Sequence, residues 1–172
     1  IIQRAAGGNS GYVLGHNLAN AADFFELCDV TLDCNLTSSP SGGATCGAVR
    51  VLGNQVRLAR VRARNWGCSL SGGTCYVFAV IAANPSGVAA VSNCGMEGCI
   101  ADAPMKLTGT PGNTGTVVMF HVGALDPAGV QQEDYARSPY IRNCFGQWDT
   151  TITGTQARGL AMNWCRGGVV EG

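Results

Sequence analysis

A chain of 172 residues, 46% hydrophobic and only 13% charged, is too apolar to stay disordered and has the length of one domain spanning residues 1–172. Its 11 basic and 11 acidic side chains give a net charge of zero at pH 7, which argues against nucleic acid as a partner. No stretch approaches the ~20 apolar residues of a membrane span. The N-terminus lacks a signal-peptide pattern, so we expect a mature form without a membrane span.

The first predicted element is a helix over residues 17–28, where apolar side chains recur at helical spacing. Beyond it, the sequon Asn35-Leu36-Thr37 precedes a run of Pro, Ser and Gly at 38–43 that is typical of a surface loop. We therefore expect Asn35 to be glycosylated.

The middle of the chain has strand patterns. In residues 56–64, Val61 and Ala63 alternate with arginines, which predicts a strand with one buried and one cationic face. The apolar runs 76–83 and 88–91 are joined by Asn84-Pro85-Ser86-Gly87, which favours a β-hairpin turn. A further strand is expected at 116–122.

A second helix is predicted at 126–137, capped by Asp126 with Pro127 in the first turn, and strands are expected at 148–155 and 160–165. No repeat of fixed period is present, so we expect neither a solenoid nor two domains. The predicted fold class is α+β and β-dominated: a twisted antiparallel sheet or sandwich with one or two short helices, stapled by disulfides.

Nine cysteines indicate an oxidising compartment, and we expect a secreted, extracellular protein. No Cys-x-x-Cys pair occurs and both histidines lie far from any tight cysteine pair, so no metal site and no cofactor is expected. The short loops from Cys68 to Cys75 and from Cys94 to Cys99 contain glycines and can close. All nine are disulfide candidates: Cys28, Cys34, Cys46, Cys68, Cys75, Cys94, Cys99, Cys144 and Cys165.

The odd cysteine count leaves one thiol over. It can be buried and inert, it can link two molecules and so cause self-association, or it can be reactive beside a histidine. These alternatives stay open at the level of the sequence.

Charge is segregated along the chain. Five arginines lie within residues 50–64 without an acid, and four acids lie within residues 23–33 without a base. The two segments can neutralise each other, the arginines can repel neighbouring strand edges, or they can form a ligand surface, because guanidinium groups pair with oxyanions and aromatic rings stack. For the last case the predicted ligand-binding residues are Arg60, Arg62, Arg64 and an exposed Trp66.

No catalytic residue is assigned. The histidines, His16 and His121, suit a capping and a core position, and no nucleophile-elbow, metalloprotease or phosphate-loop motif occurs. Several carboxylates could supply the pair that glycoside hydrolysis needs, yet nothing singles one pair out.

Small size, many cysteines and the lack of a catalytic signature give a composition that resembles the small secreted cysteine-rich proteins of fungi and related microbes. That resemblance implies a non-enzymatic binding protein, such as an effector or lectin-like module, whose partner is a host protein or glycan. A structural subunit of an extracellular assembly or filament and a secreted hydrolase are the alternatives.

Overall fold

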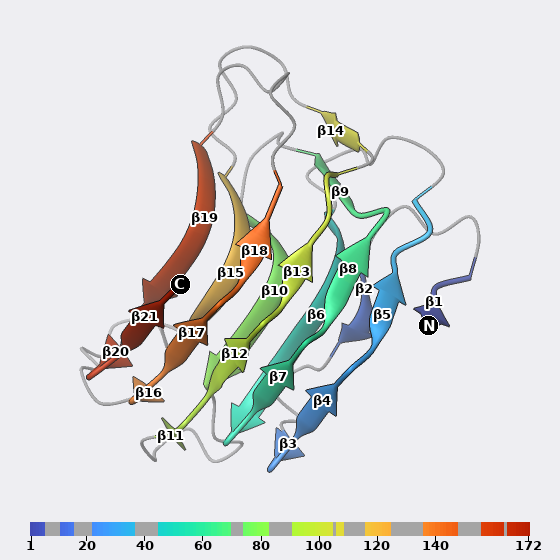
Figure 1. Cartoon of the computed structure of the whole chain (residues 1–172). Coiled ribbons are helices and arrows are strands. Elements are labelled where there is room, and N and C mark those ends of the chain that lie inside the picture. Colours follow the sequence, from blue (N-terminus) through green and yellow to red (C-terminus); the bar gives the residue numbers. More distant parts are fainter. Residues whose placement is uncertain are drawn as a thin grey trace.

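The structure is a computed structural model that describes residues 1–5, 11–15, 22–36, 45–69, 74–82, 91–104, 106–108, 116–124, 136–147, 156–163 and 165–172. Every regular element in these ranges is a β-strand. The strands follow one another around a series of stacked coils (Figure 1), and each coil pairs with the one before and the one after it.

Five coils succeed one another along the chain, preceded by β1 (Ile2–Gln3). The first contains β2 (Gly11–Gly15), β3 (Ala22–Asp23), β4 (Glu26–Cys28) and β5 (Thr31–Asp33). The second contains β6 (Thr45–Asn54), β7 (Arg57–Ala59), β8 (Arg62–Arg64) and β9 (Gly67–Ser69). The third contains β10 (Thr74–Ala82), β11 (Val91–Ser92), β12 (Gly95–Glu97), β13 (Ile100–Ala101) and β14 (Lys106–Thr108). The fourth contains β15 (Thr116–Ala124), β16 (Ala136–Arg137), β17 (Tyr140–Arg142) and β18 (Phe145–Gly146), and the fifth contains β19 (Gln156–Asn163), β20 (Cys165–Arg166) and β21 (Val169–Glu171).

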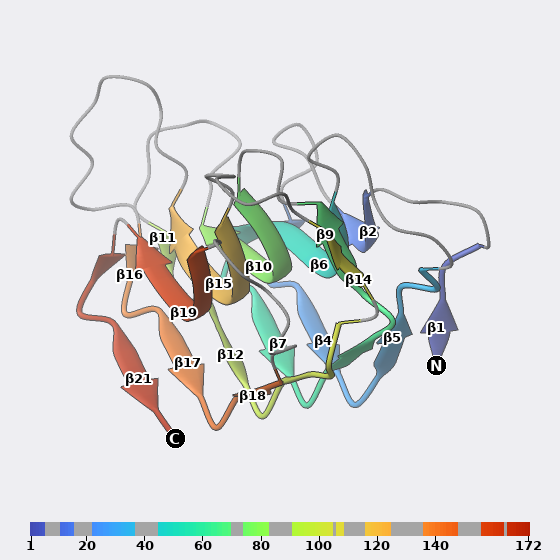
Figure 2. The ribbon, with the colours of Figure 1, turned by 90° about the horizontal axis from the view of Figure 1, so that it is seen from above.

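Equivalent strands of successive coils form parallel sheets. Two five-stranded sheets have the orders β1-β5-β8-β13-β18 and β21-β17-β12-β7-β4, and a three-stranded sheet has the order β11-β16-β20. The largest sheet has the order β14-β9-β6-β10-β15-β19, with β2 and β3 also on β6. Among the described pairs, only β6 with β9 is antiparallel. The fold is therefore a parallel β-helix, with the large sheet on one side and the five-stranded sheets on the other (Figure 2).

Each coil turns at residues with left-handed backbone conformation, five positions apart. One such column lies before the sheet that contains β12: Phe24, Gln55, Asn93, Ser138 and Gly167, with φ of 57°, 54°, 56°, 51° and 68°. The next column follows that sheet: Asp29, Arg60, Gly98, Asn143 and Gly172, with φ of 55°, 52°, 60°, 49° and 143°. Asn, Asp and Gly tolerate this conformation best, and they occupy most of the second column. Between corners, side chains alternate between the interior and the outer surface.

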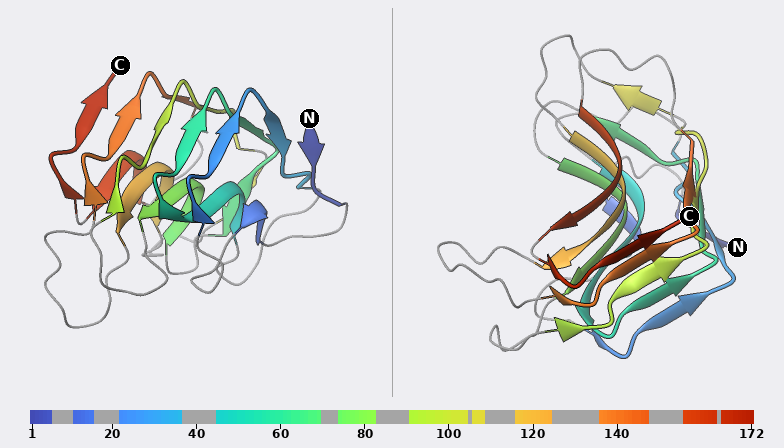
Figure 3. Two further views of the ribbon diagram at one scale, coloured as in Figure 1. Left: turned by 90° about the horizontal axis from the view of Figure 1, so that it is seen from below. Right: turned by 60° about the vertical axis from the view of Figure 1, so that its left-hand side comes forward.

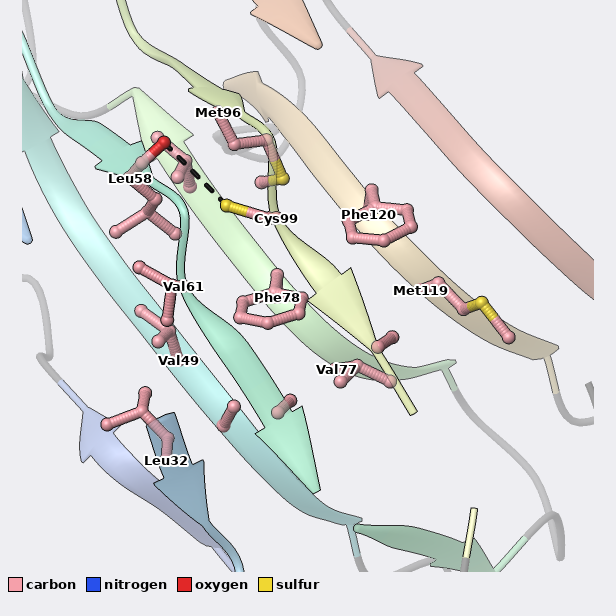
Figure 4. Packing of buried hydrophobic residues seen from close by; sticks show 14 of the residues in the cluster. Leu32, Val49, Leu58, Val61, Val77, Phe78, Met96, Cys99, Met119 and Phe120 are labelled. Atoms are coloured by element: carbon pink, nitrogen blue, oxygen red, sulfur yellow. Dashed lines mark hydrogen bonds between the residues drawn. The ribbon is translucent and has the colours of Figure 1, made fainter. Parts of the chain in front are cut away.

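The core is formed by stacked columns of inward side chains, seen from close by in Figure 4. Phe78 on β10 pairs in register with Val49 and Phe120, and the two phenyl rings stack with centroids 5.7 Å apart. Another column passes through Leu58 and Met96, both fully buried. The coils surround this interior in the rotated views of Figure 3.

The predicted antiparallel sheet or sandwich is wrong, because nearly all strand pairs are parallel and join residues one coil apart. The predicted hairpin is also wrong: β10 pairs with β6 and β15, while β11 pairs with β16. The joining residues 84–87 lie outside the described residues. The expectation that the chain is not a solenoid is wrong as well. Its coils differ in length, so the repeated structure produces no fixed period in the sequence.

The predicted helices are not found in the described residues. Residues 22–28 form β3 and β4, separated by the left-handed corner at Phe24, which is incompatible with a continuing helix. Residues 17–21 lie outside the described ranges, as does most of the second predicted helix, whose last residues form β16. The strand expected at 116–122 is confirmed by β15. Part of the strand expected at 160–165 is confirmed by β19, and the one expected at 148–155 lies outside the described ranges.

Candidate functional site

A shallow groove of about 570 Å³ lies on the outer face of the sheet β21-β17-β12-β7-β4. It draws side chains from four coils that are far apart in sequence. Its lining consists of Gln55, Arg57, Asn93, Glu97, Ser138, Tyr140, Arg142 and Val169. The groove is thus built from polar and aromatic groups and has one wall of corner residues.

That wall follows from the coil geometry. Gln55, Asn93 and Ser138 occupy equivalent left-handed corners of three successive coils, so their polar side chains stack along one edge of the groove. Amide and hydroxyl groups donate and accept hydrogen bonds at once. A column of this kind offers a repeated polar edge at the spacing of the strands, about 4.8 Å.

Tyr140 covers the middle of the groove, on the glycine of the neighbouring coil. Gly95 pairs in register with Tyr140, and a Cβ atom built on Gly95 would lie 2.6 Å from Tyr140 Cγ. Only glycine therefore lets the tyrosine ring pack against the sheet at this position. Burial raises the pKa of the Tyr140 phenol, partly opposed by the positive charge of Arg57, so the hydroxyl stays protonated at neutral pH.

Charged side chains of the groove are linked across the coils. Arg57 Nη1 donates to Glu26 Oε1 at 2.6 Å, and its Nη2 lies 3.5 Å from Glu97 Oε2. The hydrogen bond to Glu26, aided by that carboxylate's charge, raises the pKa of Arg57. These side chains remain about half exposed, with 44%, 53% and 42% of their surface accessible, so they are held in place yet reachable from solvent.

The second guanidinium of the groove belongs to Arg142. Its Cζ lies 5.4 Å from the centroid of the Tyr140 ring, within the range of a cation–π contact. Its Nε lies 3.1 Å from Glu171 Oε2. The groove therefore presents an aromatic ring between two cations, each already balanced by a carboxylate.

The three arginines predicted to bind a ligand lie beside this groove rather than in it. Arg60 occupies a corner and pairs with Asp29 at 2.5 Å, and Arg62 on β8 pairs with Asp102 at 2.8 Å. Arg64 on β8 donates to Asp33 at 2.8 Å. Ion pairing between the first and second coils, one of the alternatives that the sequence left open, thus accounts for Arg57, Arg60 and Arg64, whereas Arg62 pairs with an acid of the third coil.

Trp66 is not exposed as the sequence analysis expected. Only 1% of its surface is accessible, and its indole Nε1 donates to the backbone oxygen of Asp102 at 2.6 Å. The residue follows the left-handed corner at Asn65 and points inward, as Val56 and Val61 do after the two preceding corners of the same coil. Its expected place beside the arginines on a common outer surface is not seen.

Asn35 also occupies a left-handed corner, with φ of 49°, and its Nδ2 donates to the backbone oxygen of Arg4 at 3.0 Å. The nitrogen that would carry a glycan is therefore engaged in a hydrogen bond within the described structure. Glycosylation at this residue stays a prediction.

One of the short cysteine loops is closed. Cys68 and Cys75 form a disulfide that joins β9 to β10, as their spacing allowed. Cys94 and Cys99 do not pair with each other: their sulfur atoms lie 3.5 and 3.7 Å from the backbone oxygens of Gly53 and Leu58. The side chain of Cys46 lies outside the described parts of the structure.

In the described ranges, no three or more His, Cys, Asp or Glu side chains come together in a group that could hold a metal ion. No helix in those same ranges is long and apolar enough to cross a membrane. His121 lies on β15 with 4% of its surface accessible, against the ring of Tyr76 at 4.8 Å, as a core histidine should.

Fold and site together define a parallel β-helix protein with a polar, aromatic groove on one outer sheet. The chain matches no protein-family model, no curated protein and no solved structure. Its function must therefore be argued from the groove itself.

The groove residues escaped the sequence analysis because they come from four coils. One signal could have revealed them: Asn, Asp and Gly recur five residues apart, as at Asn93 and Gly98 or Gly167 and Gly172. Aligning the chain on these corners would have placed Glu97 opposite Arg142, but not Arg57, whose own corners are Gln55 and Arg60.

Proposed function

We propose that the protein binds a carbohydrate chain in the groove over β7, β12 and β17. The observation that carries this proposal is Tyr140, whose ring packs on Gly95 beside the guanidinium groups of Arg57 and Arg142 and a column of amide and hydroxyl side chains. Sugars offer an apolar ring face that packs on aromatic rings and hydroxyl groups that need paired donors and acceptors. An extended groove that follows the coil stack suits a chain of linked units.

Binding fits the groove better than hydrolysis does. Glycoside hydrolysis uses two carboxyl groups that face the scissile bond. Among the described residues that line the groove, Glu97 is the single carboxylate, and it faces Arg57. We therefore infer a binding module rather than a hydrolase.

We also propose that the protein is secreted. Nine cysteines and the bond between Cys68 and Cys75 support an oxidising compartment, where disulfides persist.

The proposal is tested by titrating the protein with neutral and uronic-acid oligosaccharides and measuring binding by calorimetry. We expect Tyr140→Ala to weaken the binding that the wild-type protein shows by about tenfold or more, while Tyr140→Phe retains the ring and most of the affinity. The matched control is the double variant Arg60→Ser and Arg62→Ser, which breaks two exposed ion pairs beside the groove and keeps Arg64, the partner of the buried Asp33.

Three results would overturn the proposal. The first is that no oligosaccharide binds to the wild-type protein. The second is that Tyr140→Ala binds as tightly as wild type. The third is that the double arginine variant loses binding while Tyr140→Ala keeps it, which would assign recognition to Arg60 and Arg62.

A further inference from the structure

Two cysteines that are 45 residues apart in sequence lie next to each other in the core. The strands that follow them, β13 and β18, pair in register with Ile100 opposite Phe145, and the backbone nitrogen of Phe145 donates to the backbone oxygen of Cys99 at 2.9 Å. Cys144 is therefore the residue that stacks on Cys99 in the next coil. The thiols form a side-chain hydrogen bond with each other.

The column of side chains that contains Cys99 and Cys144 changes from valine to cysteine along the stack of coils. Its members in the first two coils are Val30 and Val61, which belong to the same apolar core as Cys99 and Cys144. In the third and fourth coils, both valine positions are replaced by cysteine. Neighbouring parallel strands lie about 4.8 Å apart, within the range of Cα separations that disulfides span, roughly 4.4 to 6.8 Å.

We propose that Cys99 and Cys144 form a disulfide that links the third coil to the fourth. The co-reactant is a small-molecule disulfide, such as oxidised glutathione. Cys144 is partly exposed and lines a cavity of about 190 Å³, whereas Cys99 is fully buried behind it, so Cys144 is the thiol that meets the oxidant first.

The chemistry balances as two thiol–disulfide exchanges. The Cys144 thiolate attacks the small disulfide, forming a mixed disulfide and releasing one reduced small thiol. Cys99 then loses its proton and attacks the Cys144 sulfur, releasing the second small thiol. Two protein thiols are oxidised and one small disulfide is reduced to two thiols. The hydrogen bond from Cys99 lowers the pKa of Cys144, which favours the order of these steps.

Cys94 is a matched control within the same coil. It lies five residues before Cys99, is equally buried and points inward after an equivalent corner. Its neighbour in the next coil is Pro139, since the backbone nitrogen of Tyr140 donates to the Cys94 oxygen. Cys94 therefore has no thiol stacked on it and should stay reduced.

The experiment incubates the native protein with oxidised glutathione, alkylates the remaining thiols in denaturant, and maps the peptides without reduction. Trypsin and a glutamate-specific protease cut at Glu97, Lys106, Arg142 and Arg158, so Cys94, Cys99 and Cys144 fall on separate peptides. We expect the peptide 98–106 to be linked to the peptide 143–158, with Cys94 alkylated.

The proposal fails if Cys99 and Cys144 are both alkylated after oxidation, or if either is linked to another cysteine. Cys94→Ser should keep the linked peptide, and Cys99→Ser should leave Cys144 alkylated or glutathionylated. Even if a variant does not fold, the peptide map of the wild-type protein shows whether Cys99 and Cys144 are linked. As a second readout, oxidation should raise the unfolding midpoint of the wild-type protein by roughly 5 to 15 °C, and that of Cys99→Ser much less.

Discussion

Arg64 of the second coil donates from both Nε and Nη2 to Oδ2 of Asp33 in the first coil, at 3.0 and 2.8 Å, and only 2% of the Asp33 side chain is exposed. The other carboxylate oxygen accepts hydrogen bonds from Asn65 Nδ2 and from the backbone nitrogen of Asn35. Asp33 thus holds two corners and an arginine together. Burial acts to raise its pKa, but these hydrogen bonds and the charge of Arg64 outweigh burial and lower the pKa.

Asp33→Asn should destabilise the protein by about 2 to 3 kcal/mol, because a buried, fully hydrogen-bonded carboxylate loses its charge beside Arg64. The matched control is Asp29→Asn, which removes an equivalent pair with Arg60 whose side chains are 63% and 59% exposed. That change should cost much less than Asp33→Asn, because solvent screens the exposed pair. Urea unfolding at pH 7 measures both, and equal losses would contradict the role given to Asp33.

His121 should make stability depend on pH. Burial lowers its pKa from 6.5 to about 4. Between these values the unfolded chain binds a proton that the folded protein does not, so stability is complete above pH 6.5 and falls as the pH drops toward 4. The loss from this group amounts to about 3 kcal/mol.

The measurement compares the unfolding free energy of wild type and His121→Leu from pH 7 to pH 4. The variant should lose the slope across this window, while His16→Asn should keep it. A wild-type slope that survives in His121→Leu would show that other groups cause it. Asp33 does not interfere, because its own contribution is lost only as the pH falls below about 4.

Gly95→Ala should displace the Tyr140 side chain that lines the groove. The added methyl group would overlap the Tyr140 ring, so we expect a loss of about 1 to 3 kcal/mol and a matching loss of oligosaccharide binding. Gly159→Ala is the control, since a Cβ atom there meets nothing within 4 Å, and it should change stability by no more than about 1 kcal/mol. If a folded Gly95→Ala protein binds oligosaccharide as tightly as wild type, the position of the Tyr140 ring is not needed for binding.

Trp66→Phe should act on stability alone. It removes the hydrogen bond to the Asp102 backbone oxygen and leaves a small cavity, which together cost about 2 to 3 kcal/mol. Arg62→Ser removes only the ion pair with the Asp102 side chain and should cost much less stability than Trp66→Phe, because solvent screens the exposed arginine. Neither variant should change the oligosaccharide affinity measured by calorimetry. A loss of affinity in Trp66→Phe would show that Trp66 contributes to binding.

The alternation of apolar and charged residues predicted correctly which side chains of one strand are buried and which are exposed. Val61 and Ala63 are buried and Arg60 and Arg62 are exposed, as the pattern of residues 56–64 predicted. The strand is nevertheless split in two by a corner at Arg60, a residue that seldom adopts a left-handed conformation. The buried positions shift by one residue at this corner, from Val56 and Leu58 to Val61 and Ala63, with Ala59 also buried.

The direction and partners of the strands could not be predicted. Five residues stack in register although they are separated by 31, 38, 45 and 29 residues: Leu27, Leu58, Met96, Ile141 and Val170, of which the middle three are fully in the core. Such unequal spacing gives no fixed period. Parallel pairing depends on contacts between whole coils, which only the folded chain reveals.

By itself the sequence determined a β-dominated chain, the burial pattern between the corners, and the complementary charges of residues 23–33 and 50–64, and it allowed the loops 68–75 and 94–99 to close without deciding which does. Only the tertiary structure decided that these charges face each other across adjacent coils, that Trp66 points inward, and that Tyr140 lies on Gly95. The reason is physical: alternation is a property of neighbours along the chain, whereas a groove is made by residues whose register is set by packing one coil upon the next.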